Sequence, residues 1–356
     1  TARYIDLIRG DRRGLRLLLL QAPVVALFLL VGFMHKDFQE RVSAVDVFVG
    51  RDGELTPEAR ELVLGFRTEA QLGGRTFHLT GAEALDLYRQ LRRQDEGALR
   101  FPELARPPVT VTFRGEAVAL SGAEWEKFRA AFERENPRYT YMLLFVLVII
   151  VLWFGCNNAA KEIVKEEAVY GRERAVNLGI VPYLASKFVV QSVITSFHAL
   201  LLMVILYGTL ELLARLVPGN SVPSPAFRLG YAAQFGVLVL LSMTGVALGL
   251  LLSACVATPD RANALLPYVL IPQMILGGGF IGVSGGLLNL LAVTLSPVYW
   301  AYRAVHLGAG RLLASFPGHV DYPDGLALPC AALAAQMTLL LLLTAWFLRR
   351  KETFAG

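Results

Sequence analysis

A charged stretch within an otherwise apolar half of the chain has the residue types that bind a partner protein. Residues 161–174, called the charged segment from here on, read Lys-Glu-Ile-Val-Lys-Glu-Glu-Ala-Val-Tyr-Gly-Arg-Glu-Arg. On a helix with 100° per residue, the basic side chains form one stripe and the acidic side chains form the next. The stripes consist of Lys161, Lys165 and Arg172, and of Glu162, Glu166 and Glu173. Ile163 and Tyr170 share the apolar face.

Two interpretations of the charged segment are open on the residues alone. It can lie on the membrane as a solvated amphipathic helix. It can instead dock on a cytoplasmic partner, with paired charges setting register and orientation. Glu162 and Lys165 can pair at a spacing of three residues. Gly171 is expected to bend or end the helix, which leaves the positions of the residues after it less fixed.

Charge is distributed unevenly along the chain. The 356 residues are 55% hydrophobic and 18% charged, whereas a soluble domain has about 25% charged residues. Residues 34–138 contain 16 Lys or Arg and 18 Asp or Glu, and the other two thirds contain only 18 and 11. This pattern excludes a single soluble globule, a disordered chain and a nucleic-acid binder with basic charge over its whole surface. It predicts an integral membrane protein with one water-soluble insert.

Six apolar stretches reach, or nearly reach, the length of about 20 residues that crosses a bilayer as a helix. They cover residues 15–33, 139–155, 183–213, 229–256, 262–281 and 326–348. A seventh stretch, 287–295, is too short to cross and is expected to re-enter the membrane or lie at its surface. The predicted fold is mainly α: a six-helix transmembrane domain with a small α+β extracytoplasmic domain between helices 1 and 2.

The distribution of Lys and Arg in short flanking segments predicts the orientation. Basic residues cluster before the first span, after the second span and after the last span. Six spans put these three flanks on one side, so both termini are expected to be cytoplasmic. The predicted domains are residues 1–33, with the first span, then the outer insert 34–138, then residues 139–350 with the remaining spans.

The insert is predicted to contain strands at 45–49, 75–79, 109–113 and 117–120, and helices at 82–93 and 123–135. Both helices follow a similar start, Thr-Gly-Ala-Glu at 80–83 and Ser-Gly-Ala-Glu at 121–124. The Glu three residues after Ser or Thr is typical of a capping box. Two strand–helix units are therefore either an internal repeat or two similar caps by chance.

The charged segment and its surroundings resemble a loop of ATP-binding-cassette (ABC) exporter permeases of the G-subfamily type, which have the type V exporter fold. The family pattern runs from Trp-Phe-Gly-x-x-Asn-Ala-Ala through Glu-Ile-Val-x-Glu to Tyr-x-Arg-Glu-Arg and Tyr-x-x-Ser-Lys. This chain matches it at residues 153–160, 162–166, 170–174 and 183–187. Residues 296–301 also resemble the outer segment before the last span of that family.

The resemblance implies that residues 158–175 form a coupling helix in a groove of a nucleotide-binding domain. The residues implied in that contact are Glu162, Lys165, Glu166, Tyr170, Arg172, Glu173 and Arg174. The resemblance also implies a connecting helix at 1–16 and a homodimer of permeases. Two ATPase domains, which bind ATP and Mg²⁺, are implied as partners.

The resemblance further implies a substrate path between the two copies, lined by the second and fifth spans. The residues expected there are Phe145, Ile149, Trp153, Ile271, Gln273 and Met274. Because this lining is mostly apolar and aromatic, it suits a lipidic or amphipathic substrate. We therefore expect the permease of an ATP-driven exporter in a bacterial inner membrane.

The chain departs from the family pattern in its outer loop, and it contains no ATPase motif. The loop between the first two spans is a whole domain here, whereas it is short in most such permeases. No Gly-x-x-x-x-Gly-Lys-Ser/Thr motif occurs, and the Gly-rich stretch 277–282 has no Lys. ATP is therefore expected on a separate domain, fused before Thr1 or on another chain, and no catalytic or metal residues are expected here. The alternative is a non-transporting membrane sensor or scaffold, whose outer domain binds a ligand and whose loop signals inward.

Overall fold

The computed structural model describes most of the chain, and every structural statement below concerns that part. The described residues are 12–39, 41–43, 67–98, 109–124, 127–128, 133–135, 138–167, 169–170, 172, 179–225, 228–280, 283, 286–306 and 325–355. They divide into two compact units. The first unit is helical, and the second has its described part within residues 39–136. Strand 45–49 of the sequence prediction lies outside the described residues.

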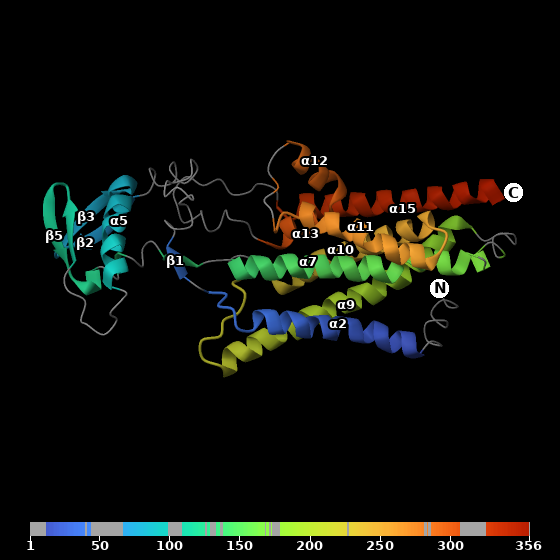
Figure 1. The fold of residues 1–356 in the computed structure, drawn as a ribbon, viewed down its shortest axis with the longest axis horizontal. Helices are drawn as coiled ribbons and strands as arrows, with labels where there is room; N and C mark the ends of the chain where they lie inside the picture. The colour runs from blue at the N-terminus through green and yellow to red at the C-terminus, as the bar shows by residue number, and fades with distance from the viewer. Residues whose placement is uncertain are drawn as a thin grey trace. The chain divides into compact units, whose positions relative to one another are not determined.

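The first unit is a bundle of helices that run roughly along one direction (Figure 1). Its long helices are α2 (Arg12–Phe33), α7 (Arg138–Ala159), α9 (Ile180–Leu216), α10 (Tyr231–Cys255), α11 (Pro259–Leu276) and α15 (Ala327–Ala355). Each covers one of the six apolar stretches of the sequence. α10 contacts α7, α9 and α15, and α2 lies against α9.

Four helical segments are long and apolar enough to cross a membrane, as far as the described residues go: 138–166, 180–216, 231–255 and 327–351. This confirms an integral membrane protein. The apolar part of α2, 18–33, is a shorter apolar helix. α11, which contains Pro267 and Pro272, is not among the four segments either. The count of six spans therefore stays a prediction.

Glycines bring α7 and α10 into close backbone contact. A Cβ atom on Gly249 of α10 would lie 2.4 Å from the Cys156 carbonyl oxygen of α7, and one on Gly155 would lie 2.4 Å from the Ser242 carbonyl oxygen. Gly245, one turn before Gly249, would meet the Leu152 carbonyl oxygen at 2.7 Å. Small residues four apart allow this approach in membrane helices. The Gly-x-x-x-Gly signal at 245–249 was present in the sequence but did not enter the sequence prediction.

We expect Gly249→Ala to lower the free energy of unfolding by about 1–3 kcal/mol, because the added methyl overpacks a backbone–backbone contact. The measurement is thermal unfolding of the purified protein in detergent. Gly236→Ala is the matched control on the same helix, since a Cβ there meets nothing within 4 Å. Equal effects of the two substitutions would contradict the close-contact assignment.

The short apolar stretch forms a helix of its own, α12 (Gly286–Leu295), followed by α13 (Pro297–Val305). Three side chains from three helices donate to the last carbonyls of α12. Gln336 Nε2 of α15 donates to Val293 O (3.3 Å) and Thr294 O (3.2 Å), and Trp300 Nε1 of α13 donates to Val293 O (2.8 Å). Gln273 Nε2 of α11 donates to Leu295 O at 3.1 Å. Helix ends leave such carbonyls without an intrahelical partner, so these donors fix α12 by its end.

In the second unit, the described strands form three antiparallel pairs: β1 (Arg41–Ser43) with β6 (Glu133–Glu135), β2 (Arg67–Leu72) with β3 (Arg75–Thr80), and β4 (Val109–Phe113) with β5 (Glu116–Leu120). Helix α5 (Gly81–Ala98) follows the second hairpin strand β3. The hairpin at 109–120 and helix α5 confirm the sequence prediction. The helix predicted over 123–135 is wrong at its end, because residues 133–135 pair with β1 as a strand.

Both predicted capping boxes form, and each Glu also reaches the turn of the other hairpin. Glu83 accepts from the Thr80 amide (2.9 Å) and pairs with Arg114 Nε (2.9 Å) in the β4–β5 turn. Glu124 accepts from the Ser121 amide (2.9 Å) and from the Gly74 amide (2.7 Å) in the β2–β3 turn. These bonds lower the pKa of Glu83 to about 2, chiefly through Arg114. The reciprocal contacts favour an internal repeat over two chance caps.

Candidate functional site

The charged segment lies at one end of the helical unit, where α7 ends. It is not one continuous helix over its described part: α7 ends at Ala159, a turn follows, and Val164–Glu166 form a single 3₁₀ turn. Ser253 of α10 explains the break, because its Oγ accepts the amides of both Ile163 and Val164 at 3.0 Å. The uniform helical stripes predicted from the sequence therefore need correction in this part.

The apolar side chains of the charged segment are buried in the helical unit. Ile163 is 3% exposed and Tyr170 is 8% exposed. Both belong to one apolar cluster with residues of α9, α10 and α15. The Tyr170 ring lies 4.4 Å from the ring of Tyr183 on α9, measured between centroids. The predicted apolar face therefore exists, and it packs against other helices of the unit.

Two acidic side chains of the charged segment turn toward a buried lysine of α9. Lys187 is 3% exposed at its side chain, and its Nζ lies 2.7 Å from Glu166 and 3.7 Å from Glu162. Glu162, itself 5% exposed, also pairs with Lys165, as the spacing predicted. This cluster ties the charged segment to α9, and it uses acidic groups that the sequence had assigned to a partner.

The third acidic side chain pairs with the end of the last helix. Lys351 of α15 donates from Nζ to Glu167 Oε1 at 3.1 Å. The described acidic groups of the charged segment, Glu162, Glu166 and Glu167, therefore pair with three cations, and two of these come from other helices. The pairs with Lys187 and Lys351 have no local signal in the sequence, because the paired residues are 21 to 184 positions apart.

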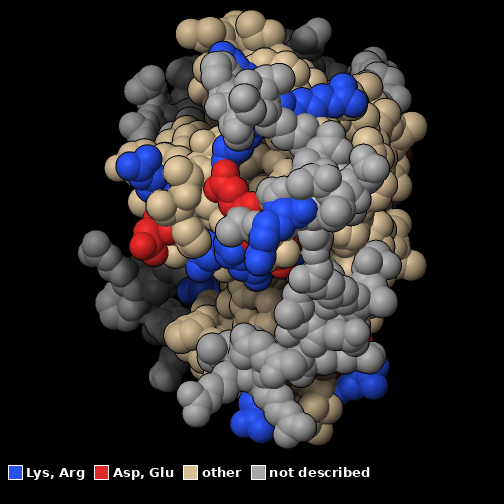
Figure 2. Space-filling view, turned by 90° about the vertical axis from the view of Figure 1, so that its right-hand side faces the viewer, with Lys and Arg blue, Asp and Glu red and all other residues tan. Residues whose placement is uncertain are grey.

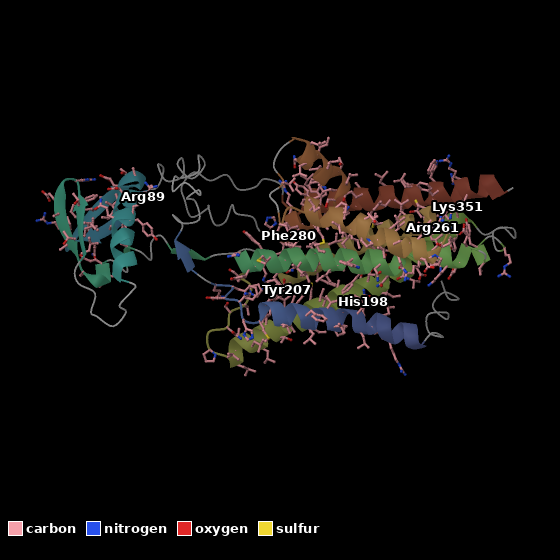
Figure 3. The ribbon with its side chains drawn as sticks, viewed as in Figure 1. Arg89, His198, Tyr207, Arg261, Phe280 and Lys351 are labelled. Atoms are coloured by element: carbon pink, nitrogen blue, oxygen red, sulfur yellow. The ribbon has the colours of Figure 1, made fainter. Side chains whose placement is uncertain are left out.

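Basic side chains remain on the outward side of this end. Lys165 is 47% exposed at its side chain, and Arg172 and Arg261 are exposed. Seen onto this end, a few acidic side chains lie near the middle of the face with Lys and Arg beside them (Figure 2). Figure 3 places Arg261 and Lys351 at this same end of the helical unit. Glu173 and Arg174 lie outside the described residues.

The turn between α10 and α11 lies beside the charged segment. Val164 forms a small buried cluster with Val256 at the end of α10 and Ala262 at the start of α11. Thr258 caps α11, since its Oγ1 accepts the Arg261 amide at 3.3 Å. The end of the unit is therefore built from the charged segment and this turn together.

The structure separates the six residues expected along a substrate path. Trp153 and Ile271 are 47% and 54% exposed, and Met274 is partly buried. Phe145 and Ile149 are instead 2% and 9% exposed and belong to the main core. Gln273, 8% exposed, caps the end of α12 as described above.

Phe145 packs against the glycine-rich end of α11. Its ring lies 5.0 Å from the rings of Phe280 and of Tyr302, measured between centroids. A Cβ atom on Gly279 would lie 2.2 Å from the Phe145 ring, so only glycine leaves room for this ring. The glycines at 277–279 thus serve helix packing, and no phosphate-binding contact is needed to explain them.

A histidine in the middle of α9 is also buried. His198 is fully buried, and its Nδ1 lies 3.5 Å from the Asn158 side-chain amide of α7. The Phe154 ring packs edge-on against it at 5.6 Å between centroids. No group of three or more His, Cys, Asp or Glu side chains that could hold a metal ion occurs in the part searched, the described residues.

Comparison with known proteins identifies the family. A family model described as ABC-2 type transporter matches residues 114–308, more than half of the chain. The chain is also similar to the ABC transporter ATP-binding/permease protein Rv1747 of Mycobacterium tuberculosis (strain ATCC 25618 / H37Rv), at 24% identity over 173 residues. That match covers 48% of this chain and 19% of the relative, so the chain spans about a fifth of the relative's length. Apolar helices of spanning length, the family match and the resemblance at the charged segment lead to one conclusion: this chain belongs to the ABC-2 type transporter family, as a transmembrane permease.

Proposed function

We propose that this permease is the membrane part of an ATP-driven exporter and that its charged segment docks on an ABC ATPase domain. One observation carries the proposal. The charged segment is anchored on its inner side by Ser253 and Lys187, while Lys165 and Arg172 stay exposed on its outer side. Such a segment can receive a push from a partner and pass it to several helices at once.

The anchoring suggests how ATP would drive the permease. ATP and Mg²⁺ would bind on the partner, and closure of two ATPase domains would move the charged segments of two permease copies. Because Lys187 ties the segment to α9 and Ser253 ties it to α10, these helices would shift as rigid bodies. The ATPase is proposed to precede Thr1 on the same polypeptide, in line with the relative whose name gives both activities.

A lipidic or amphipathic substrate fits the exposed apolar side chains best. Trp153 of α7 and Ile271 of α11 are large, apolar and about half exposed. We propose that they face the path between two copies. Export, with the insert on the outer side and both termini in the cytoplasm of a bacterial inner membrane, rests on the family resemblance and on the basic flanks.

The test is binding and coupling of the ATPase. Lys165→Glu/Arg172→Glu is expected to lower co-purification with the ATPase partner and to reduce ATP-dependent transport in vesicles at least about tenfold, because it reverses two exposed charges of the docking face. The matched control is the same reversal at Arg215, an exposed residue near the far end of α9. Normal binding and transport by the double variant would refute the docking assignment. Binding to a kinase or adaptor in place of an ATPase would favour the sensor alternative.

A further inference from the structure

The last residues of α15 make polar contacts that the family assignment does not account for. Lys351 Nζ donates to Glu167 Oε1 of the charged segment at 3.1 Å and to the Val256 carbonyl oxygen at 3.2 Å. Val256 caps the C-terminus of α10, where carbonyls lack intrahelical partners and the helix dipole favours a cation. One ammonium group therefore joins α15, the end of α10 and the charged segment.

An apolar contact supports the same junction independently. Leu348, one turn before Lys351, is 2% exposed. It belongs to the buried cluster that also contains Ile163 and Tyr170 of the charged segment and Tyr183 of α9. The C-terminal end of α15 thus packs on the charged segment with both an apolar and a charged side chain.

The junction is notable because α15 is the least buried of the four candidate spans. Of the 18 most apolar consecutive residues of α15, only 17% are buried, compared with 67% in the segment that begins with α7. Trp346 and Arg350 lie on an exposed side of α15, with the Arg350 guanidinium 5.4 Å from the Trp346 ring centroid. Leu348 and Lys351 therefore fix the C-terminal end of a helix that is otherwise widely exposed.

We propose that Lys351 is a positioning residue that couples α15 and the end of α10 to the charged segment, so that the last helix moves with the segment. This rests on the proposed function, since the segment must be moved by an ATPase. It adds α15 to the helices that receive the push, beside α9 at Lys187. Breaking the Lys351 contacts loosens the end of α15 against the charged segment and leaves the ATPase docking face at Lys165 and Arg172 intact.

A charge-swap cycle in the full ATPase–permease complex tests the proposal. Lys351→Glu and Glu167→Lys are each expected to lower the substrate transported per ATP hydrolysed by about threefold, and Lys351→Glu, which lies outside the charged segment, is expected to keep basal ATP hydrolysis. The double swap Lys351→Glu/Glu167→Lys should recover part of that loss, because it restores the ion pair but not the donation to the Val256 carbonyl oxygen. Arg349→Glu is the matched control, because it reverses an exposed charge two residues away on the same helix. A double swap that is no better than the single variants, or a control equal to Lys351→Glu, would overturn the proposal.

A second readout does not depend on transport. The amides of Ile163 and Val164 donate to Ser253, so their hydrogen exchange reports how firmly the charged segment is held. Lys351→Met is expected to raise their exchange rates by about threefold, with Arg349→Met unchanged. Unchanged exchange in Lys351→Met would also overturn the proposal. If transport is absent from the unmodified complex but Lys351→Met still raises exchange, the exporter function fails while the structural junction stands.

Discussion

Lys187→Met is expected to lower the free energy of unfolding by about 3–5 kcal/mol, which is the largest stability effect expected in this chain. The substitution keeps the length of the side chain but removes its charge. Glu166 then loses a partner at 2.7 Å, and the nearly buried Glu162 loses one at 3.7 Å. Glu162 keeps the exposed Lys165, and Glu166 loses its described cation, which costs much more than an exposed ion pair contributes. The measurement is unfolding of the purified protein in detergent, together with co-purification of the ATPase.

Lys165→Met is the matched control for this prediction. Lys165 pairs with the same Glu162, but its side chain is 47% exposed, so its loss should cost less than about 1 kcal/mol. A further variant separates burial from function. Lys187→Met/Glu162→Gln/Glu166→Gln removes the unpaired charge and should regain most of the stability. Its ATP-dependent transport should stay low, because the charged segment is no longer tied to α9 by Lys187. If Lys187→Met were as stable as Lys165→Met, the buried cluster would not anchor the charged segment.

Gln336→Leu is expected to loosen the end of α12 against the helical unit and to lower the free energy of unfolding by about 1–2 kcal/mol. The amide of Gln336 donates to two carbonyls, Val293 O and Thr294 O, at the end of α12. Trp300 still donates to Val293 O, so Thr294 O is the carbonyl that loses its described donor. Gln273→Leu should act in the same direction through Leu295 O. Hydrogen exchange of residues 286–296 and transport assays measure the effect.

Thr338→Val controls for loss of a polar side chain on the same helix. Thr338 Oγ1 donates only within α15, to Ala334 O at 2.8 Å, so α12 should not respond to its loss. The double variant Gln336→Leu/Gln273→Leu should lose more than either single variant, because the two amides cap different carbonyls. Exchange in α12 that rises equally in Thr338→Val would show that the glutamine caps do not hold this helix.

The helices could be predicted from the sequence because apolar stretches are a local property. Each of the six stretches coincides with a helix, and even the short stretch 287–295 forms α12. The capping boxes at Thr80 and Ser121 were equally local and formed as expected. Strand β2 was missed, and residues 133–135 were predicted as helix, because strand pairing depends on a partner elsewhere in the chain.

The candidate site was predicted only in part, for the same physical reason. Its residue types singled out the charged segment as a surface for a partner protein. The helical wheel then placed Glu166 on a docking stripe, whereas a buried lysine at position 187 holds it inside. Phe145 was expected along a path because the family resemblance implies one beside the second span, and the structure packs its ring against Gly279 in the core.

By itself, then, the sequence determined that this protein is a membrane protein, where its helices lie and which segment concentrates the charges of the membrane part. Hydropathy and charge spacing are readable from neighbouring residues, so no fold is needed to see them. Only the tertiary structure decided which charged side chains stay exposed, which glutamines hold α12 and that the end of α15 contacts the charged segment. These contacts join side chains from helices distant in sequence, and burial decides their energies.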